Sequence, residues 1–199
     1  MDRFSRVFTV FKKNYTLVPL EIFGSDPYKT LVSTLMSART NDSTTLAAAS
    51  RLFKKAPSLK SLRSLKEDEI SKLIYPVGFY KTKAKHIAKL ARMINSVPKT
   101  REALVKLPGV GRKTANLVLN RAFKIPAIAV DTHVHRIANL LGWVKTKTPE
   151  ETERELNKIL PKKYWPETNR LFVSIGRKFP SKRKLEDFLT NNKLISKLQ

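Results

Sequence analysis

A chain of 199 residues with 40 Lys and Arg against 16 Asp and Glu has a formal net charge of +24, which favours nucleic acid over an anionic membrane surface as its partner. No apolar run approaches the roughly 20 residues that span a bilayer, and Met1-Asp2-Arg3 does not begin a secretory signal, so we expect an intracellular protein. The absence of cysteine excludes disulfides, thiolate zinc sites and cysteine-ligated iron–sulfur clusters.

Helical signals run along almost the whole chain. Pairs of residues with capping character predict four helix starts: Asp26 with Pro27, Asn41 with Asp42, Ser64 with Glu67, and Thr148 with Glu151. Apolar residues share one helical face at Ala115, Val118, Leu119, Ala122 and Phe123. Residues 125–130 could form a strand, but no partner strand is evident, so we interpret them as a buried connector. The pattern predicts an all-α protein of about ten helices.

One segment in the first half of the chain has a similar pattern to a segment in the second half. Residues 73–80, followed by Lys83-Ala84, resemble the segment around Leu107 in their helix–Gly turn–helix pattern. Two helix pairs with similar turn chemistry would explain this, and so would a duplicated unit. No low-complexity linker or longer repeat divides the chain.

The turn Leu107-Pro108-Gly109-Val110-Gly111 lies between a short predicted helix, residues 102–106, and an amphipathic helix that starts at Arg112. Pro108 ends the first helix, and the two glycines permit backbone angles closed to other residues. Main-chain N–H groups can then approach an anion at the positive end of the second helix. This pattern predicts a phosphate site that binds duplex DNA without reading its sequence. The alternative is an ordinary corner of an all-α protein.

Two runs resemble a known family, the endonuclease III branch of the helix-hairpin-helix DNA glycosylases. They are Leu107-Pro-Gly-Val-Gly-Arg-Lys-Thr-Ala-Asn116, and Ile128-Ala-Val-Asp-Thr-His133 with Arg136. The resemblance extends from about residue 25 to about residue 178 and includes residues 35–42 and 78–80. It implies an all-α fold of two helical subdomains with a helix-hairpin-helix motif and a DNA-binding, active-site cleft between them. The expected subdomains are a six-helix domain of residues 20–125 and a second one of residues 1–19 plus 126–199.

The resemblance also implies a base-excision-repair DNA glycosylase with AP lyase activity on double-stranded DNA that contains a damaged base or an abasic site. It assigns the nucleophile to Lys113, whose amine would displace the base, form a Schiff base and cleave the strand by β-elimination. A place just inside a helix N-terminus disfavours the ammonium form, which cannot attack. Asp131 has the position of an N-cap. The resemblance gives its carboxylate the added role of stabilising charge on the sugar and moving protons.

Extrusion of the damaged nucleotide must precede this chemistry. Family members fill the vacated space with side chains from two loops, and the matching positions here are Arg39 and Phe79. The family commonly has Gln where this chain has Arg39, which leaves the opposite-base preference open. Phe79 could instead be a core residue. The other DNA-binding positions implied are Pro108, Gly109, Val110, Gly111, Arg112, Thr114 and His133.

The C-terminal region departs from the family pattern. Ile175-Gly176-Arg177 resembles the segment that leads into four cluster-binding cysteines, but Pro180 and a basic run follow here, so we expect no iron–sulfur cluster. Candidates for holding the C-terminal helices instead are Phe172, Phe179 and Phe188. We expect no side-chain metal site. The resemblance allows a Na⁺ or K⁺ ion at the main-chain carbonyls of Val105, Leu107 and Val110.

Three alternative functions are compatible with this pattern. The first is a bifunctional glycosylase that acts on oxidised pyrimidines. The second is a related glycosylase for alkylated or mismatched bases, and the third is a non-catalytic helix-hairpin-helix DNA-binding protein. The presence of both Lys113 and Asp131 favours an enzyme, and the resemblance implies a monomer.

Overall fold

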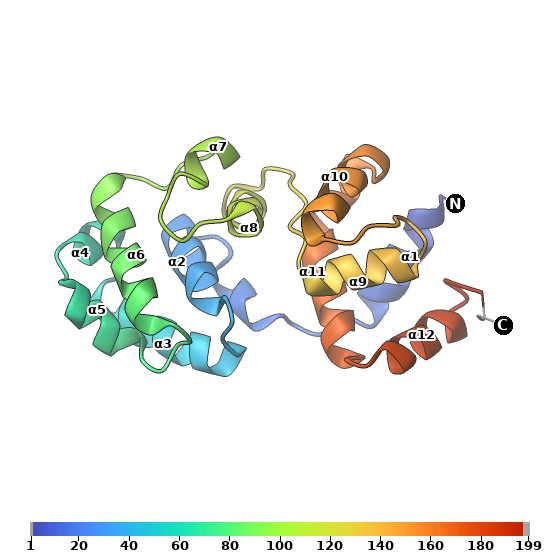
Figure 1. Ribbon diagram of the computed structural model, residues 1–199, viewed down its shortest axis with the longest axis horizontal. Helices are drawn as coiled ribbons and strands as arrows, with labels where there is room; N and C mark the ends of the chain where they lie inside the picture. Colours follow the sequence, from blue (N-terminus) through green and yellow to red (C-terminus); the bar gives the residue numbers. More distant parts are fainter. Residues whose placement is uncertain (1, 197–199) are drawn as a thin grey trace. The chain divides into compact units, whose positions relative to one another are not determined.

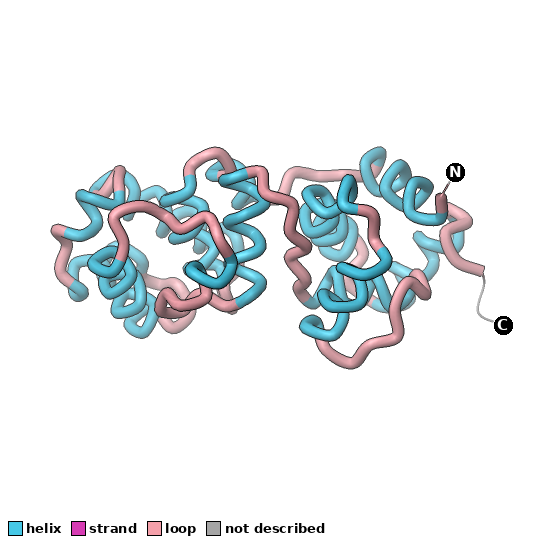
Figure 2. Tube along the Cα trace, turned by 90° about the horizontal axis from the view of Figure 1, so that it is seen from above, coloured by secondary structure: helices cyan, strands magenta, loops and turns pink. Residues whose placement is uncertain are grey.

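The computed structural model describes residues 2–196, and these form twelve α-helices and two short 3-10 helices without a strand (Figures 1 and 2). They fall into two compact units. One is Pro19–Ile125, and the other combines the residues up to Val18 with those from Pro126 onward. Residues 127–130 are buried without being a strand, as expected for a connector, whereas Ile125 and Pro126 are exposed. The predicted all-α class is confirmed for the described residues.

The first unit contains seven α-helices, where six were expected. They are α2 (Pro27–Ser37), α3 (Asp42–Lys55), α4 (Leu59–Arg63), α5 (Glu67–Ile74), α6 (Tyr80–Met93), α7 (Arg101–Leu104) and α8 (Arg112–Phe123), and the 3-10 helix η1 (Pro19–Phe23) precedes them. Helix α2 packs against α3, α6, α8 and η1. Its Leu31, Val32 and Met36 side chains are fully buried. The core of this unit is therefore centred on α2, and the helix that follows the hairpin packs directly on it.

Most of the predicted helix starts are confirmed. Asp26 caps α2 and Asn41 caps α3, each by accepting a backbone N–H three residues ahead. The predicted pairing of Ser64 with Glu67 is wrong. Ser64 ends α4, and Glu69 instead accepts the Lys66 N–H at 2.8 Å to support the start of α5. A capping serine and a helix-ending serine look alike in sequence, because either can precede a helix.

The second unit is built from both ends of the chain. It contains α1 (Arg3–Lys13), α9 (Thr132–Leu140), α10 (Pro149–Ile159), η2 (Lys162–Tyr164), α11 (Trp165–Lys178) and α12 (Lys182–Asn191). Thr148 caps α10 with Pro149 at its first position, as predicted. Helix α11 packs against both α1 and α9. Phe8, Phe11 and Phe172 form the centre of the core, with at most 2% of each exposed.

The C-terminal helix α12 is held by aromatic side chains. Phe179 and Phe188 stack with ring centroids 4.4 Å apart, and Phe188 lies 6.2 Å from Phe11. Phe11 in turn meets Phe172 edge to face at 5.0 Å. The three phenylalanines expected to hold the C-terminal helices thus form one continuous chain of contacts with α1.

Arg136 holds the same region by hydrogen bonds. From α9, its guanidinium donates to the carbonyl oxygens of Gly176 at 3.1 Å, Phe179 at 3.3 Å and Pro180 at 2.5 Å. These carbonyls belong to the end of α11 and the link to α12, where a helix leaves its last acceptors unpaired. A cation at a helix C-terminus is also favourable. Arg136 therefore fixes the corner between α11 and α12.

Candidate functional site

The hairpin between α7 and α8 is a tight turn anchored by two apolar residues. Leu107 and Val110 are each only 5% exposed, and the Val110 N–H donates to the Leu107 carbonyl at 3.1 Å. Gly109 lies between them with φ of +74°, a region that favours glycine. A Cβ at Gly109 would also lie 2.6 Å from Nδ1 of His86 on α6. Both the backbone angle and the lack of space require glycine here.

Gly111 differs from what the sequence predicted. Its φ of −91° and ψ of 178° are extended angles that any residue can adopt, and a Cβ there would meet nothing within 4 Å. The prediction that both glycines are needed for their backbone angles is therefore wrong for Gly111. Its missing side chain instead leaves the surface at the start of α8 unobstructed.

The N-terminus of α8 has the features of an anion site. Gly111 is the N-cap and makes no side-chain capping bond, and the first N–H groups of any helix have no acceptor within it. Arg112 and Lys113 are the first two helical residues, and both are exposed. The hairpin thus presents main-chain N–H groups, the positive end of a helix and two cationic side chains in one place.

Asp131 is the N-cap of α9, as its sequence position predicted. Its Oδ1 accepts the N–H groups of His133 and Val134, both at 3.0 Å, which fixes the carboxyl group. The His133 ring packs so closely on Gly176 of α11 that a Cβ at that glycine would collide with it. Asp131 and His133 therefore lie on a firmly packed helix start in the second unit, whereas Lys113 belongs to the first.

Arg39 and Phe79 come from separate loops, and the structure brings them together. The guanidinium carbon of Arg39 lies 5.2 Å from the centroid of the Phe79 ring, within the range of a cation–π contact. Phe79 is 61% exposed, so the alternative that it is a core residue is wrong. Both residues have positive φ, 54° for Arg39 and 58° for Phe79. Two exposed side chains are thus held side by side by backbone angles that few non-glycine residues adopt.

The sequence interpretation missed the residue beneath this pair. Lys83 of α6 is only 7% exposed, and its Nζ donates to Met36 O, Ala38 O and Thr40 Oγ1. Burial lowers its pKa to about 8. A signal was present in the sequence, because Lys83 precedes Ile87 by four residues and so shares its buried helical face.

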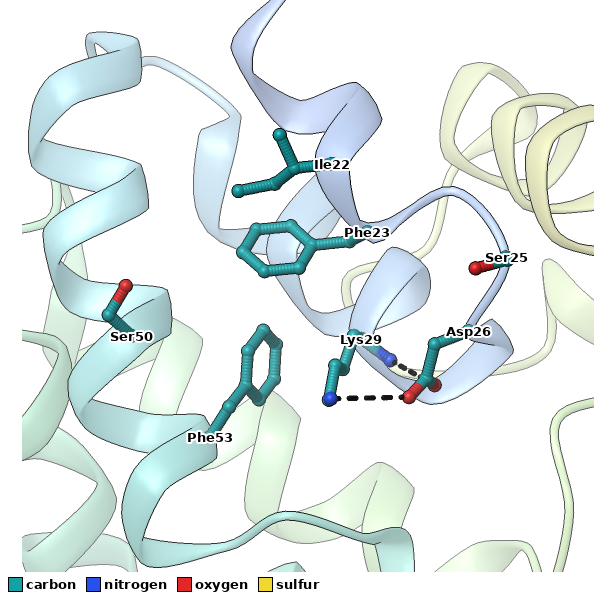
Figure 3. Close-up of a pocket in the computed structure, with 7 residues that line it drawn as sticks. All are labelled: Ile22, Phe23, Ser25, Asp26, Lys29, Ser50 and Phe53. Atoms are coloured by element: carbon teal, nitrogen blue, oxygen red, sulfur yellow. Dashed lines mark hydrogen bonds and ion pairs between the residues drawn. The ribbon is translucent and has the colours of Figure 1, made fainter.

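A hollow elsewhere in the first unit is lined by none of the candidate site residues. It is lined by Ile22, Phe23, Ser25, Asp26, Lys29, Ser50 and Phe53 (Figure 3). The Asp26 carboxylate there is occupied by the Lys29 N–H at 3.0 Å and the Lys29 ammonium at 3.6 Å. In residues 2–196, no cluster of three or more His, Asp and Glu could hold a metal ion. No described helix has the length and apolar character needed to cross a membrane.

Known proteins resemble this chain in both sequence and structure. The model of the HhH-GPD superfamily of base excision DNA repair proteins matches residues 32–162. Endonuclease III of Thermotoga maritima is 47% identical over 159 residues, which cover 77% of this chain and 75% of that protein. Endonuclease III of Rickettsia conorii is 36% identical over 185 residues, which cover 90% and 88% of the two chains. A solved structure of a trapped endonuclease III–DNA covalent intermediate matches with a TM-score of 0.74 at 34% identity, over 84% of this chain and 78% of that one.

Proposed function

Because this chain belongs to the HhH-GPD superfamily of base excision DNA repair proteins and is a DNA glycosylase and AP lyase of the endonuclease III type, we propose that it removes oxidised pyrimidines from duplex DNA with Lys113 as the attacking amine. The observation that carries this assignment is the hairpin itself. Lys113 is exposed as the second residue of α8, directly beside the anion site at Gly111. A phosphate bound there would bring the adjoining sugar near the amine.

The proposed reaction starts when the neutral Lys113 amine attacks C1′ of the extruded nucleotide. The bond between C1′ and the base breaks, and the base leaves with the bonding electrons and a proton. Loss of a proton from nitrogen and opening of the sugar ring give a Schiff base. Removal of a C2′ proton then expels the 3′ phosphate by β-elimination, and water releases the sugar remnant from Lys113. Asp131 is the group that we assign to stabilise charge on the sugar and to carry protons.

Arg39 and Phe79 are the residues that we assign to the gap left by the extruded nucleotide. The exposed Phe79 ring can stack on the neighbouring bases, and the Arg39 guanidinium can donate to the base left unpaired on the opposite strand. We assign the phosphate contacts to the hairpin, residues 108–112, with Thr114 and His133. Intercalation would thus come from one pair of loops and the phosphate grip from another.

The hairpin carbonyls of Val105, Leu107 and Val110 would hold a Na⁺ or K⁺ ion in this proposal. The Leu107 oxygen already accepts the Val110 N–H, and a carbonyl oxygen has a second lone pair available. A bound cation would add positive charge near the phosphate. The chain has no cysteine for an iron–sulfur cluster, and an intracellular location alongside DNA follows from the proposed substrate.

Borohydride trapping tests the assignment. Separate duplexes would contain thymine glycol, dihydrouracil, 3-methyladenine, a G·T mismatch or an abasic site. We expect covalent complexes with the two oxidised pyrimidines and the abasic site, and none with Lys113→Gln. Lys106→Gln is the matched control, because it removes the same charge from an exposed position of the same hairpin.

The other outcomes identify the alternatives. Release of 3-methyladenine or of mismatched thymine, without action on thymine glycol, would replace the proposed substrate class. Trapping that persists in Lys113→Gln would assign the nucleophile elsewhere. Tight binding without trapping on any duplex would leave a DNA-binding protein without catalysis.

A further inference from the structure

Lys83 is a buried cation whose hydrogen-bonding capacity is fully used by one stretch of chain. Its Nζ donates to Met36 O at 2.7 Å, Ala38 O at 2.5 Å and Thr40 Oγ1 at 3.2 Å. An ammonium group has three donors, so each has an acceptor. All three acceptors lie at or just beyond the C-terminal end of α2, where helix carbonyls lack partners and a positive charge is favourable.

Thr40 extends this contact to the second loop. Its Oγ1 accepts the Gly78 N–H at 3.1 Å as well as the Lys83 ammonium, and lies 3.3 Å from the Ala38 carbonyl oxygen, to which it donates. The residue after Gly78 is Phe79, and the residue before Thr40 is Arg39. One lysine and one hydroxyl group therefore tie together the two backbones that present the exposed pair.

The two backbones are also packed at the limit of contact. A Cβ on Gly78 would lie 2.6 Å from the Arg39 carbonyl oxygen. Positive φ angles at Arg39 and Phe79 each cost free energy, and such angles persist only where surrounding contacts enforce them. Neither Arg39 nor Phe79 is buried. Backbone hydrogen bonds from Thr40 N–H to Ser37 O and from Lys83 N–H to Phe79 O restrain each loop separately, and the Lys83 and Thr40 side-chain hydrogen bonds join the two loops.

Stability alone does not account for a lysine at this position. The neighbouring residues on the same face of α6 are Ala84, Ile87 and Leu90, all fully buried. Burying an ammonium group costs desolvation free energy that an apolar residue of similar length would avoid. Burial accordingly lowers the pKa of Lys83 to about 8. A costly cation whose donors all go to one loop is typical of a residue kept for the geometry it imposes.

We propose that Lys83 and Thr40 are positioning residues that hold Arg39 and Phe79 as a single preformed wedge, and that they thereby set the efficiency of nucleotide extrusion and the choice of opposite base. This inference rests on the proposed function and deepens it. Neither residue touches the reacting atoms. The wedge can fill the gap left by an extruded nucleotide and contact the opposite base only in duplex DNA, because a single strand has neither a paired stack nor an opposite base.

The difference between duplex and single-stranded substrates provides the test. AP lyase rates would be measured on the same abasic-site oligonucleotide as a single strand and as a duplex with each of the four opposite bases. Variants would be Lys83→Met and the milder Thr40→Val, which keeps the side-chain shape but removes the acceptor. Their matched controls are Lys85→Met and Thr82→Val, both exposed on α6. Fluorescence of 2-aminopurine opposite the abasic site would report wedge insertion directly.

We expect kcat/KM on duplex to fall by at least about tenfold in Lys83→Met, with discrimination among opposite bases reduced and the 2-aminopurine signal changed. Single-strand cleavage should change by less than about twofold. Thr40→Val should follow in the same direction to a smaller extent. Equal losses on both substrates, or no loss on duplex, would overturn the proposal. If the wild-type protein cleaves neither substrate, the proposed function fails instead.

Discussion

Two turns of the first unit share a hydrogen bond at their start and a positive φ two residues later, but a different residue takes that angle in each. The turn after α5 and the turn after α7 each begin when a backbone N–H donates to a carbonyl three residues earlier, Val77 to Ile74 and Leu107 to Leu104. Two residues further on, each turn has a positive φ, at Phe79 in the first and at Gly109 in the second. The glycine takes this angle without strain, whereas the phenylalanine does not.

This difference corresponds to the two roles that we propose, phosphate contact for the turn at Gly109 and insertion into the duplex for the turn at Phe79. At Gly109 the absence of a side chain lets the turn take a positive φ and pack against His86 of α6, in a turn to which we assign phosphate contacts. At Phe79 the same backbone angle presents an aromatic ring to solvent, at a cost in conformational free energy. Helix α6 supports both turns. Its Lys83 donates to Thr40 Oγ1, which in turn accepts the Gly78 N–H of the first turn, and its His86 lies against Gly109 of the second. Similar turn chemistry explains the similar sequence patterns without requiring a duplicated unit.

The largest expected effect comes from placing a side chain in the second turn. Gly109→Ala should lower the free energy of unfolding by about 1–3 kcal/mol, because its positive φ is strained and its Cβ would meet His86. Affinity for an abasic-site duplex should fall by about tenfold or more, or about 1.4 kcal/mol. Urea unfolding and fluorescence anisotropy would measure the two quantities.

Two other glycines serve as controls for this prediction. Gly111→Ala should leave the free energy of unfolding nearly unchanged, since its φ is ordinary and its Cβ has open space. Gly142→Ala has a positive φ but open space in the second unit, so it should lose stability without losing DNA affinity. Unchanged affinity in Gly109→Ala would break the assignment of the second turn to phosphate.

The reverse exchange tests the first turn. Phe79→Gly relieves the positive φ and loses little buried surface, so we expect the free energy of unfolding to stay level or rise by up to about 1 kcal/mol. Cleavage of duplex DNA should fall severalfold at the same time. Lys124→Gly is the control, because Lys124 is exposed with φ of 58° at the end of α8 and has no assigned DNA contact. A stability loss in Phe79→Gly with full activity would contradict the trade-off.

A pH dependence of the free energy of unfolding is also expected from Lys83. Burial lowers its pKa to about 8 from the ordinary value of 10.5. Between these values the unfolded chain binds a proton that the folded protein has released, so this group makes the free energy of unfolding rise with pH. The rise is absent below pH 8, where both states are protonated. Urea unfolding at pH 8 and pH 10.5 should show a smaller increase in Lys83→Met than in Lys85→Met, and equal increases would show that burial does not shift the Lys83 pKa.

Local signals predicted the helices and the hairpin well. Asp26, Asn41 and Thr148 cap helices by bonding to N–H groups three residues away, so short windows of sequence contain the whole interaction. The assignment failed at Ser64, where the same residue type ends one helix just before another begins. The need for glycine was predicted at Gly109 but wrongly extended to Gly111, since a Gly-x-Gly pattern does not specify which φ is positive.

The support of the wedge could not be predicted, because it depends on contacts between residues far apart in sequence. Lys83 meets the end of α2 across more than 40 positions, and no local pattern specifies that partner. A lysine on an otherwise apolar helical face was the available signal. The pairing of Arg39 with Phe79 required the tertiary structure for the same reason.

The second unit has a consequence for the order in which the chain folds as it is synthesised. Helix α1 is synthesised before the other described helices, but the Phe172 and Phe188 side chains that its Phe11 contacts lie more than 150 residues later. The Pro19–Ile125 unit is contiguous and can form in the meantime. The apolar face of α1 must therefore stay exposed, or be held by a chaperone, until Trp143, Tyr164 and then α11 have been made, and its contact with α12 forms last. Truncation before α12 would thus remove the Phe188 contact of Phe11 and leave its contact with Phe172 of α11 in place.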